Sequence, residues 1–199
     1  MKPLQLASLF CATFALVHPA AAEWFVRPSA LYVSYQNCGY GDNTGLSLAA
    51  GTTLGSLAQH ELSVEVASLK WSISQYNGWY TIGSGHFVTY LAHYRFRFGP
   101  NNSRLRFYLG PSLGLANFRG NLTQYRFGVV ARDNLGRWPL AYGGTAGVTL
   151  KFSNVTELDV GYRYLYIARS DSSPNSVYLH IPTAAIKANL LHAGLGFRF

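Results

Sequence analysis

The sequence predicts an all-β protein, a single antiparallel up-and-down transmembrane β-barrel of about eight strands, and three observations lead there. Only 12% of the 199 residues are charged, whereas soluble domains carry about 25%. Aromatic residues reach 15%, with 14 Tyr and 12 Phe, and apolar residues recur with a period of two in segment after segment. This composition argues against a disordered chain, which is rich in charge, and against a helical bundle, which needs more helix-favouring residues.

The first 22 residues are expected to be an export signal rather than part of the fold. Lys2 supplies a positive charge, the apolar run 4–17 follows, and Ala20-Ala21-Ala22 provides a cleavage site before Glu23. The apolar run is too short to cross a bilayer as a helix. Residues 23–199 are then expected to form the single barrel domain.

Strand patterns fill most of the rest of the chain. The strongest lie at 88–98, 105–115, 158–166 and 191–199, and weaker ones at 31–35, 46–50, 62–66 and 140–150. Short breaks at 51–56, 99–103 and 153–155 alternate with long breaks at 36–44, 71–85, 119–139 and 168–183. Tight turns on one rim and long loops on the other produce this alternation in an up-and-down barrel.

The polar face of these strands indicates which side meets lipid. It is rich in Gly and Ser, as in Gly110, Ser112 and Gly114, and has few Lys or Glu. A surface in water is usually rich in charge, whereas the lumen of eight strands has little room for large side chains. All four tryptophans fall at strand ends or in breaks, where interface girdles lie: Trp24, Trp71, Trp79 and Trp138. We therefore predict that the apolar face contacts lipid; a soluble lipocalin-like binder is the alternative.

Two motifs add a family resemblance. The segment Glu157-Leu158-Asp159-Val160-Gly161-Tyr162-Arg163-Tyr164 resembles the seventh-strand signature of small outer-membrane barrels of the OmpA, OmpX and opacity-protein type. The terminus resembles the C-terminal signal of that family, in which alternate apolar residues end on Phe: Leu191, Leu195, Phe197 and Phe199. The resemblance implies a location in the bacterial outer membrane, and it implies that the barrel-assembly machinery reads these four residues.

Charged residues on the predicted inner face form the first candidate site. They are Glu61, Glu65, Arg95, Arg97, Arg106, Glu157, Asp159, Arg163 and Arg198. Because unpaired charges in a narrow lumen are costly, we expect them to form an interlocked network of arginines and carboxylates. Such a network would plug the lumen; a narrow gated ion pore is the alternative.

The remaining signals bear on partners and activity. Clustered arginines in the third long break are candidate contacts for lipopolysaccharide phosphates, or solvated loop charges: Arg119, Arg126, Arg132 and Arg137. We assign no catalytic residue, metal site or cofactor. A lipid A-modifying enzyme is the alternative, with His180 and Asp171 as candidates in the last long break. The expected protein is a monomer without a nucleic-acid partner, embedded in outer-membrane lipid, which supports membrane integrity or surface interactions through its long loops.

Overall fold

The computed structural model describes residues 23–36, 41–55, 59–76, 80–99, 103–126, 129–168 and 185–199, and its regular elements are all β-strands. In chain order they are β1 (Glu23–Gln36), β2 (Asn43–Leu54), β3 (His60–Tyr76), β4 (Tyr80–Phe98), β5 (Leu105–Arg126), β6 (Val129–Arg137), β7 (Leu140–Lys151), β8 (Thr156–Ile167) and β9 (Ile186–Arg198). Within these ranges, no helix has the length and apolar content that crossing a membrane requires. The predicted export signal and most of the break at 168–183 lie outside the described residues.

The strands close into a barrel of eight. Each strand pairs antiparallel with its neighbours, and the pairing of β1 with β9 completes the ring. Strands β6 and β7 both pair with the same side of β5, so they are the two halves of one barrel strand. That strand is interrupted at Trp138 and Pro139, where the Pro139 carbonyl still accepts a hydrogen bond of 2.9 Å from the Ala116 amide. The predicted closed, up-and-down architecture is confirmed.

Apolar side chains cover the outer wall of this barrel. Leu109 and Leu113 of β5 are 54% and 58% exposed, and Tyr90 of β4 is 44% exposed. In the same strands, Ser112, His93 and other polar residues are buried in the interior. Because successive residues of a strand point to opposite faces, this alternation turns the apolar face outward, as predicted for a barrel in lipid.

The first strand departs from the prediction in its second half. Leu31, Val33 and Tyr35, the residues of the pattern at 31–35, are buried inside the barrel, whereas Tyr32 between them is 44% exposed. Both faces of this half of β1 carry apolar or aromatic residues. The period of two therefore predicts a strand there, but it does not predict which face contacts lipid.

Two of the predicted long breaks are largely strand rather than loop. Residues 71–76 and 80–85 extend β3 and β4 as a paired hairpin, with Trp71 opposite Gly85. Residues 119–126 and 129–137 likewise continue β5 and form β6. Gly, Ser and Asn in these segments suggested loops, but cross-strand pairing outweighs the low strand propensity of these residues.

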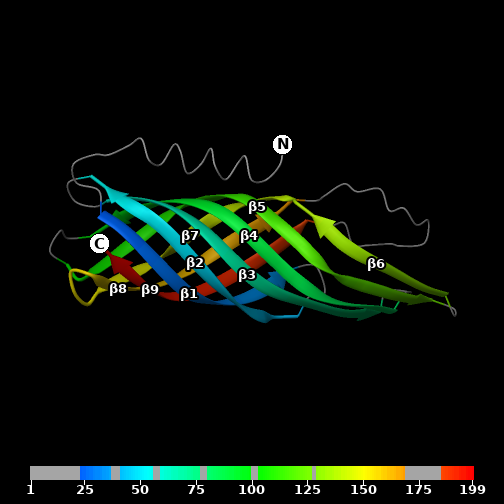
Figure 1. The fold of residues 1–199 in the computed structure, drawn as a ribbon. Coiled ribbons are helices and arrows are strands. Elements are labelled where there is room, and N and C mark those ends of the chain that lie inside the picture. Colours follow the sequence, from blue (N-terminus) through cyan, green and yellow to red (C-terminus); the bar gives the residue numbers. More distant parts are fainter. Residues whose placement is uncertain are drawn as a thin grey trace.

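The two ends of the barrel differ (Figure 1). The start of β1 and the C-terminus lie at one end, where Trp24 and Phe199 are joined by backbone hydrogen bonds. At this same end β2, β4 and β7 finish, and the next strand in each case begins only a few residues later in the sequence. At the opposite end, the β3–β4 and β5–β6 hairpins extend well beyond the barrel wall. Because outer-membrane barrels turn their short connections to the periplasm, we call these the periplasmic and the extracellular end.

Candidate functional site

The charged residues predicted for the inner face lie mostly buried in the periplasmic half of the lumen. Eight of the nine are buried: Glu61, Glu65, Arg95, Arg97, Glu157, Asp159, Arg163 and Arg198. The ninth, Arg106, is only partly buried, near the periplasmic start of β5. The eight buried residues come from β3, β4, β8 and β9, so closure of the barrel brings distant parts of the chain together.

Arg27 of β1 is the centre of the larger group of ion pairs, and the sequence analysis missed it. Its guanidinium lies 3.0 Å from the Glu61 carboxylate, 2.8 Å from Glu157 and 3.3 Å from Asp159. Arg97 also pairs with both glutamates, at 2.9 Å from Glu157 and in a short contact with Glu61. The signal was present, because Arg27 is in register with the inward residues of its strand, but it stands four positions before the apolar pattern at 31–35.

Two further arginines complete this group. Arg95 pairs with Asp159 at 2.8 Å. Arg198 pairs with Glu157 at 2.6 Å and with the partly exposed Glu23 at 2.7 Å. The group therefore contains four arginines and four carboxylates: Arg27, Arg95, Arg97 and Arg198 with Glu23, Glu61, Glu157 and Asp159. So many ionised side chains can be buried together because positive and negative charges are equal in number and each forms hydrogen bonds to its partners.

A second ion pair lies further from the periplasmic end. The Arg163 guanidinium donates to both carboxylate oxygens of Glu65, at 2.6 and 3.0 Å. The Nε2 atom of His93 lies 3.9 Å from Glu65, and its Nδ1 atom is 2.7 Å from the Ser112 hydroxyl. This arrangement of Ser, His and Glu has the residue types of a catalytic triad, but all three side chains are at most 4% exposed.

The Tyr108 side chain lies along the inner wall from β5 towards β8 and β9. Its hydroxyl donates to Asp159 at 2.9 Å and lies 2.9 Å from Nε2 of His192. The ring fits because the next two strands carry glycines at the paired positions, Gly147 opposite Tyr108 and Gly161 opposite Gly147, and a Cβ atom at either position would overlap the Tyr108 hydroxyl. The glycines of the polar face thus make room for a large side chain that lies along the inner wall from a neighbouring strand.

The extracellular half of the lumen is apolar, which corrects the prediction of a uniformly small and polar interior. A single cluster of buried residues fills it, including Leu69, Trp71, Phe87, Leu165 and Leu190. It lies directly beyond the ion pairs along the same strands, since Glu65 precedes Leu69 on β3 and Arg163 precedes Leu165 on β8. The lumen therefore holds two stacked layers, one ionic and one apolar.

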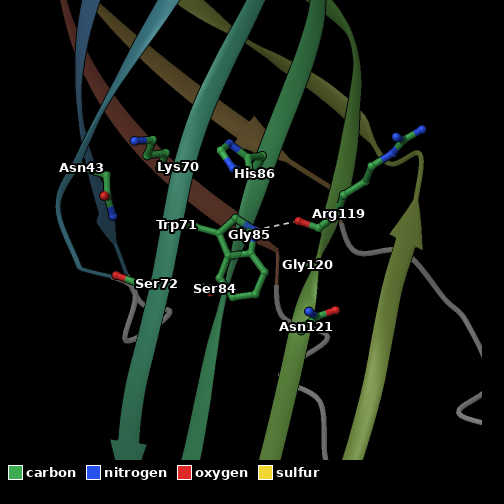
Figure 2. A pocket seen from close by; sticks show the side chains of 10 residues that line it. All are labelled: Asn43, Lys70, Trp71, Ser72, Ser84, Gly85, His86, Arg119, Gly120 and Asn121. Atoms are coloured by element: carbon green, nitrogen blue, oxygen red, sulfur yellow. Dashed lines mark hydrogen bonds between the residues drawn. The ribbon is translucent and has the colours of Figure 1, made fainter.

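Trp71 belongs to this apolar layer and not to an interface girdle, contrary to prediction. It is only 1% exposed, and its indole lies over Gly85 and Gly120 of the two following strands. Its Nε1 donates a hydrogen bond of 3.3 Å to the Arg119 carbonyl (Figure 2). Trp24 and Trp138 are exposed, at 37% and 45%, as a girdle position requires; Trp79 lies outside the described residues.

The other predicted site residues lie on the outer surface or outside the described part. Arg119 is exposed at the extracellular rim, beside a pocket that residues 70–72, 84–86, 119–121 and Asn43 line (Figure 2). Arg126, Arg132 and Arg137 belong to β5 and β6, but their side chains are not among those described. The C-terminal residues face outward, with Leu191, Leu195, Phe197 and Phe199 exposed at 43% or more.

No metal centre is found among the described side chains, since no three His, Cys, Asp or Glu residues gather there as ligands. The candidate catalytic residues His180 and Asp171 lie outside the described residues.

Comparison with known proteins agrees with the lipid-facing wall. The model of the outer membrane protein beta-barrel domain family matches residues 6–199. The chain belongs to this family. Membership places it in the bacterial outer membrane, which the apolar outer wall independently indicates. No curated protein matches the chain.

Solved structures with the same fold include three small barrels of the outer membrane. Neisserial surface protein A is 17% identical, covers 90% of this chain and 99% of its own, and superposes with a TM-score of 0.60. Outer membrane protein H from Pseudomonas aeruginosa is 17% identical, covering 89% and 99%, with a TM-score of 0.52. A major outer membrane protein from Thermus thermophilus is 14% identical, covering 90% and 100%, also at 0.52. At these identities the likeness shows the shared fold.

Proposed function

We propose that this barrel is a non-enzymatic structural protein of the outer membrane, whose closed lumen preserves the permeability barrier and whose extracellular hairpins present an interaction surface. The observation that carries the proposal is the pair of stacked layers in the lumen. The ionic layer and the apolar layer use inward side chains from β1, β3, β4, β5, β7, β8 and β9.

The two layers oppose the passage of ions for different reasons. An ion in the ionic layer would have to displace arginines and carboxylates that already hold one another at 2.6 to 3.3 Å. In the apolar layer an ion would lose its hydration shell without gaining a polar partner, and the free-energy cost of that step is larger than in the ionic layer. A plugged lumen is therefore a better interpretation than a narrow pore.

Burial also argues against an enzyme that acts through the lumen. Ser112, His93 and Glu65 combine the residue types of a hydrolase, yet they lie beneath the apolar layer, and a lipid substrate would need access to them. We interpret this group as structural, with the serine hydroxyl hydrogen-bonded to Nδ1 of the histidine.

Planar-bilayer recording tests the closed lumen. The purified protein is expected to give no stable open channel, whereas a double variant Trp71→Ala with Phe87→Ala removes two of the largest buried side chains of the apolar layer and should admit ions more often. Stable, large conductance steps from the unmodified protein would contradict the plug.

Mass spectrometry of lipid A from cells with and without the protein tests the absence of enzymatic activity. We expect identical lipid A species in both strains. Loss or gain of an acyl chain that depends on the protein would favour the lipid A-modifying enzyme instead.

A further inference from the structure

A row of basic side chains crosses the outer face of β3, β4 and β5 at the extracellular rim. Lys70 lies directly opposite His86, and His86 directly opposite Arg119 (Figure 2). All three side chains are exposed. Lys70 stands between Leu69 and Trp71, which are both buried in the lumen, so its own side chain faces away from the lumen.

The surroundings of this row leave its charge available to an anion. Among the described residues, no carboxylate forms an ion pair with Lys70 or Arg119. The Nε atom of Arg119 donates to the Asn117 side chain at 3.2 Å, which orients the guanidinium along the outer wall. The residue directly opposite Arg119 on β6 is Gly136, which has no side chain to cover the guanidinium.

The row lies at the depth where a membrane changes from hydrocarbon to headgroups. On the periplasmic side of the row, the outward residues of β4 from Phe98 to Val88 are all apolar or aromatic, and only Ala92 among them is small. At about 3.4 Å per residue this stretch is about 34 Å long, and a strand tilt of about 40° reduces it to about 26 Å along the membrane normal. That height matches the apolar band of about 25 Å in outer-membrane barrels, and the basic row follows directly above it.

The spacing within the row fits a ligand with two separate phosphates. Lys70 and Arg119 stand on strands separated by one strand, so their backbones are about 10 Å apart. In the next row, Ser72 lies opposite Ser84, and Ser84 opposite Asn121, which places exposed hydroxyl and amide groups beside the cations. The cations of the first row suit phosphate groups, and the hydroxyl and amide groups of the second row suit the hydroxyl groups of a sugar ring.

We propose that Lys70 and Arg119 bind the two phosphates of a diphosphorylated glycolipid headgroup, of the lipid A class, in the outer leaflet. His86, Ser72 and Ser84 contact its sugar backbone, while the apolar wall below packs against its acyl chains. The proposal rests on the proposed function, since it requires the barrel to sit in the outer membrane. It gives the role in membrane integrity a physical basis, because a bound glycolipid seals the boundary between protein and bilayer.

Binding to defined lipids tests the site. The protein is purified in detergent, and its affinity is measured for lipid A with both phosphates and for the same lipid after phosphatase treatment. The double variant Lys70→Ala with Arg119→Ala is compared with Arg104→Ala with Lys151→Ala, which removes the same two residue types at the periplasmic rim. We expect the first variant to weaken binding of diphosphorylated lipid A by about tenfold or more, and the second to change it by less than about twofold. Dephosphorylated lipid A should bind the unmodified protein and the first variant equally.

The variant Ser84→Asp provides a second measurement, because it places a carboxylate between the proposed phosphate sites without removing either cation. It should also weaken binding of diphosphorylated lipid A, and heat-modifiable gel mobility verifies that each variant is folded.

Equal binding by the unmodified protein and the Lys70 and Arg119 variant would overturn the proposal, as would equal losses in both double variants. Inorganic phosphate that competes fully with lipid A would instead indicate a simple anion site. Conductance measured on the same preparations reports the proposed plug separately, so failure of one proposal is distinguishable from failure of the other.

Discussion

At the scale of single residues, Arg27 illustrates how much of the interior depends on contacts between distant strands. Its partners Glu61 and Glu157 lie 34 and 130 residues away along the chain. Alternation within a strand indicates that a charge points inward, as for most of the predicted lumen residues, but it carries no information about the partner across the barrel. The separation of the charges into a larger group around Arg27 and the pair of Arg163 with Glu65 could therefore not be predicted.

Replacing Arg27 should destabilise the barrel more than replacing any rim arginine. Arg27→Ala leaves three buried carboxylates short of one cation, and breaking a buried ion pair costs about 3–5 kcal/mol. Urea unfolding followed by tryptophan fluorescence measures the loss. The control Arg104→Ala removes an exposed side chain and should change stability by less than about 0.5 kcal/mol; equal losses would contradict a special role for Arg27.

The glycines that face Tyr108 should tolerate no side chain. A Cβ atom on Gly161 would overlap the Tyr108 hydroxyl and lie 2.7 Å from the His192 ring, so Gly161→Ala is expected to cost about 1–3 kcal/mol through overpacking. On β7, the nearest atom to a Cβ at Gly144 is 3.8 Å away, an ordinary contact. Gly144→Ala is the matched control and should be nearly neutral in the same unfolding measurement. Equal tolerance at both positions would mean that Tyr108 does not occupy the lumen as described.

At the scale of elements, the periodicity of two predicts strands well where lipid and lumen differ in character. It fails where they do not. In β1 the lumen side becomes as apolar as the lipid side, so the prediction that Leu31 and Val33 face lipid is wrong. In the β3–β4 and β5–β6 hairpins, small and polar residues on paired strands imitate a loop. Gly85 and Gly120 are there to accommodate Trp71, a reason that only the packed structure reveals.

The β5–β6 hairpin should be dispensable for the barrel. Strand β6 pairs only with β5 among the described strands, and Asn121 and Asn134 lie directly opposite each other in it. Replacing residues 122–133 by an Asn-Gly turn, which suits a two-residue hairpin, should leave heat-modifiable gel mobility unchanged. A shortened protein that no longer folds would show that the hairpin contributes to the barrel itself. The matched control shortens β9 and should abolish folding, because β9 closes the ring.

At the scale of the whole molecule, closure through β1 and β9 should be visible by cross-linking. Ala30 and Ala193 are direct partners and both are exposed on the outer wall. In a Cys38→Ser background, Ala30→Cys with Ala193→Cys is expected to form a disulfide in folded protein on mild oxidation. The control pair Ala30→Cys with Ala92→Cys joins strands that are not neighbours and should remain reduced. A cross-link in the control alone would contradict the strand order.

The ion pairs beside this closure limit how the protein can exchange molecules with its surroundings. Arg27 of β1 reaches Glu157 of β8, and Arg198 of β9 reaches back to Glu23 of β1. Parting the first and last strands would draw these charges towards hydrocarbon, at a cost that hydrogen bonds in the wall cannot offset. A lateral gate between β1 and β9, which would admit lipid from the bilayer into the interior, would have to break these ion pairs first.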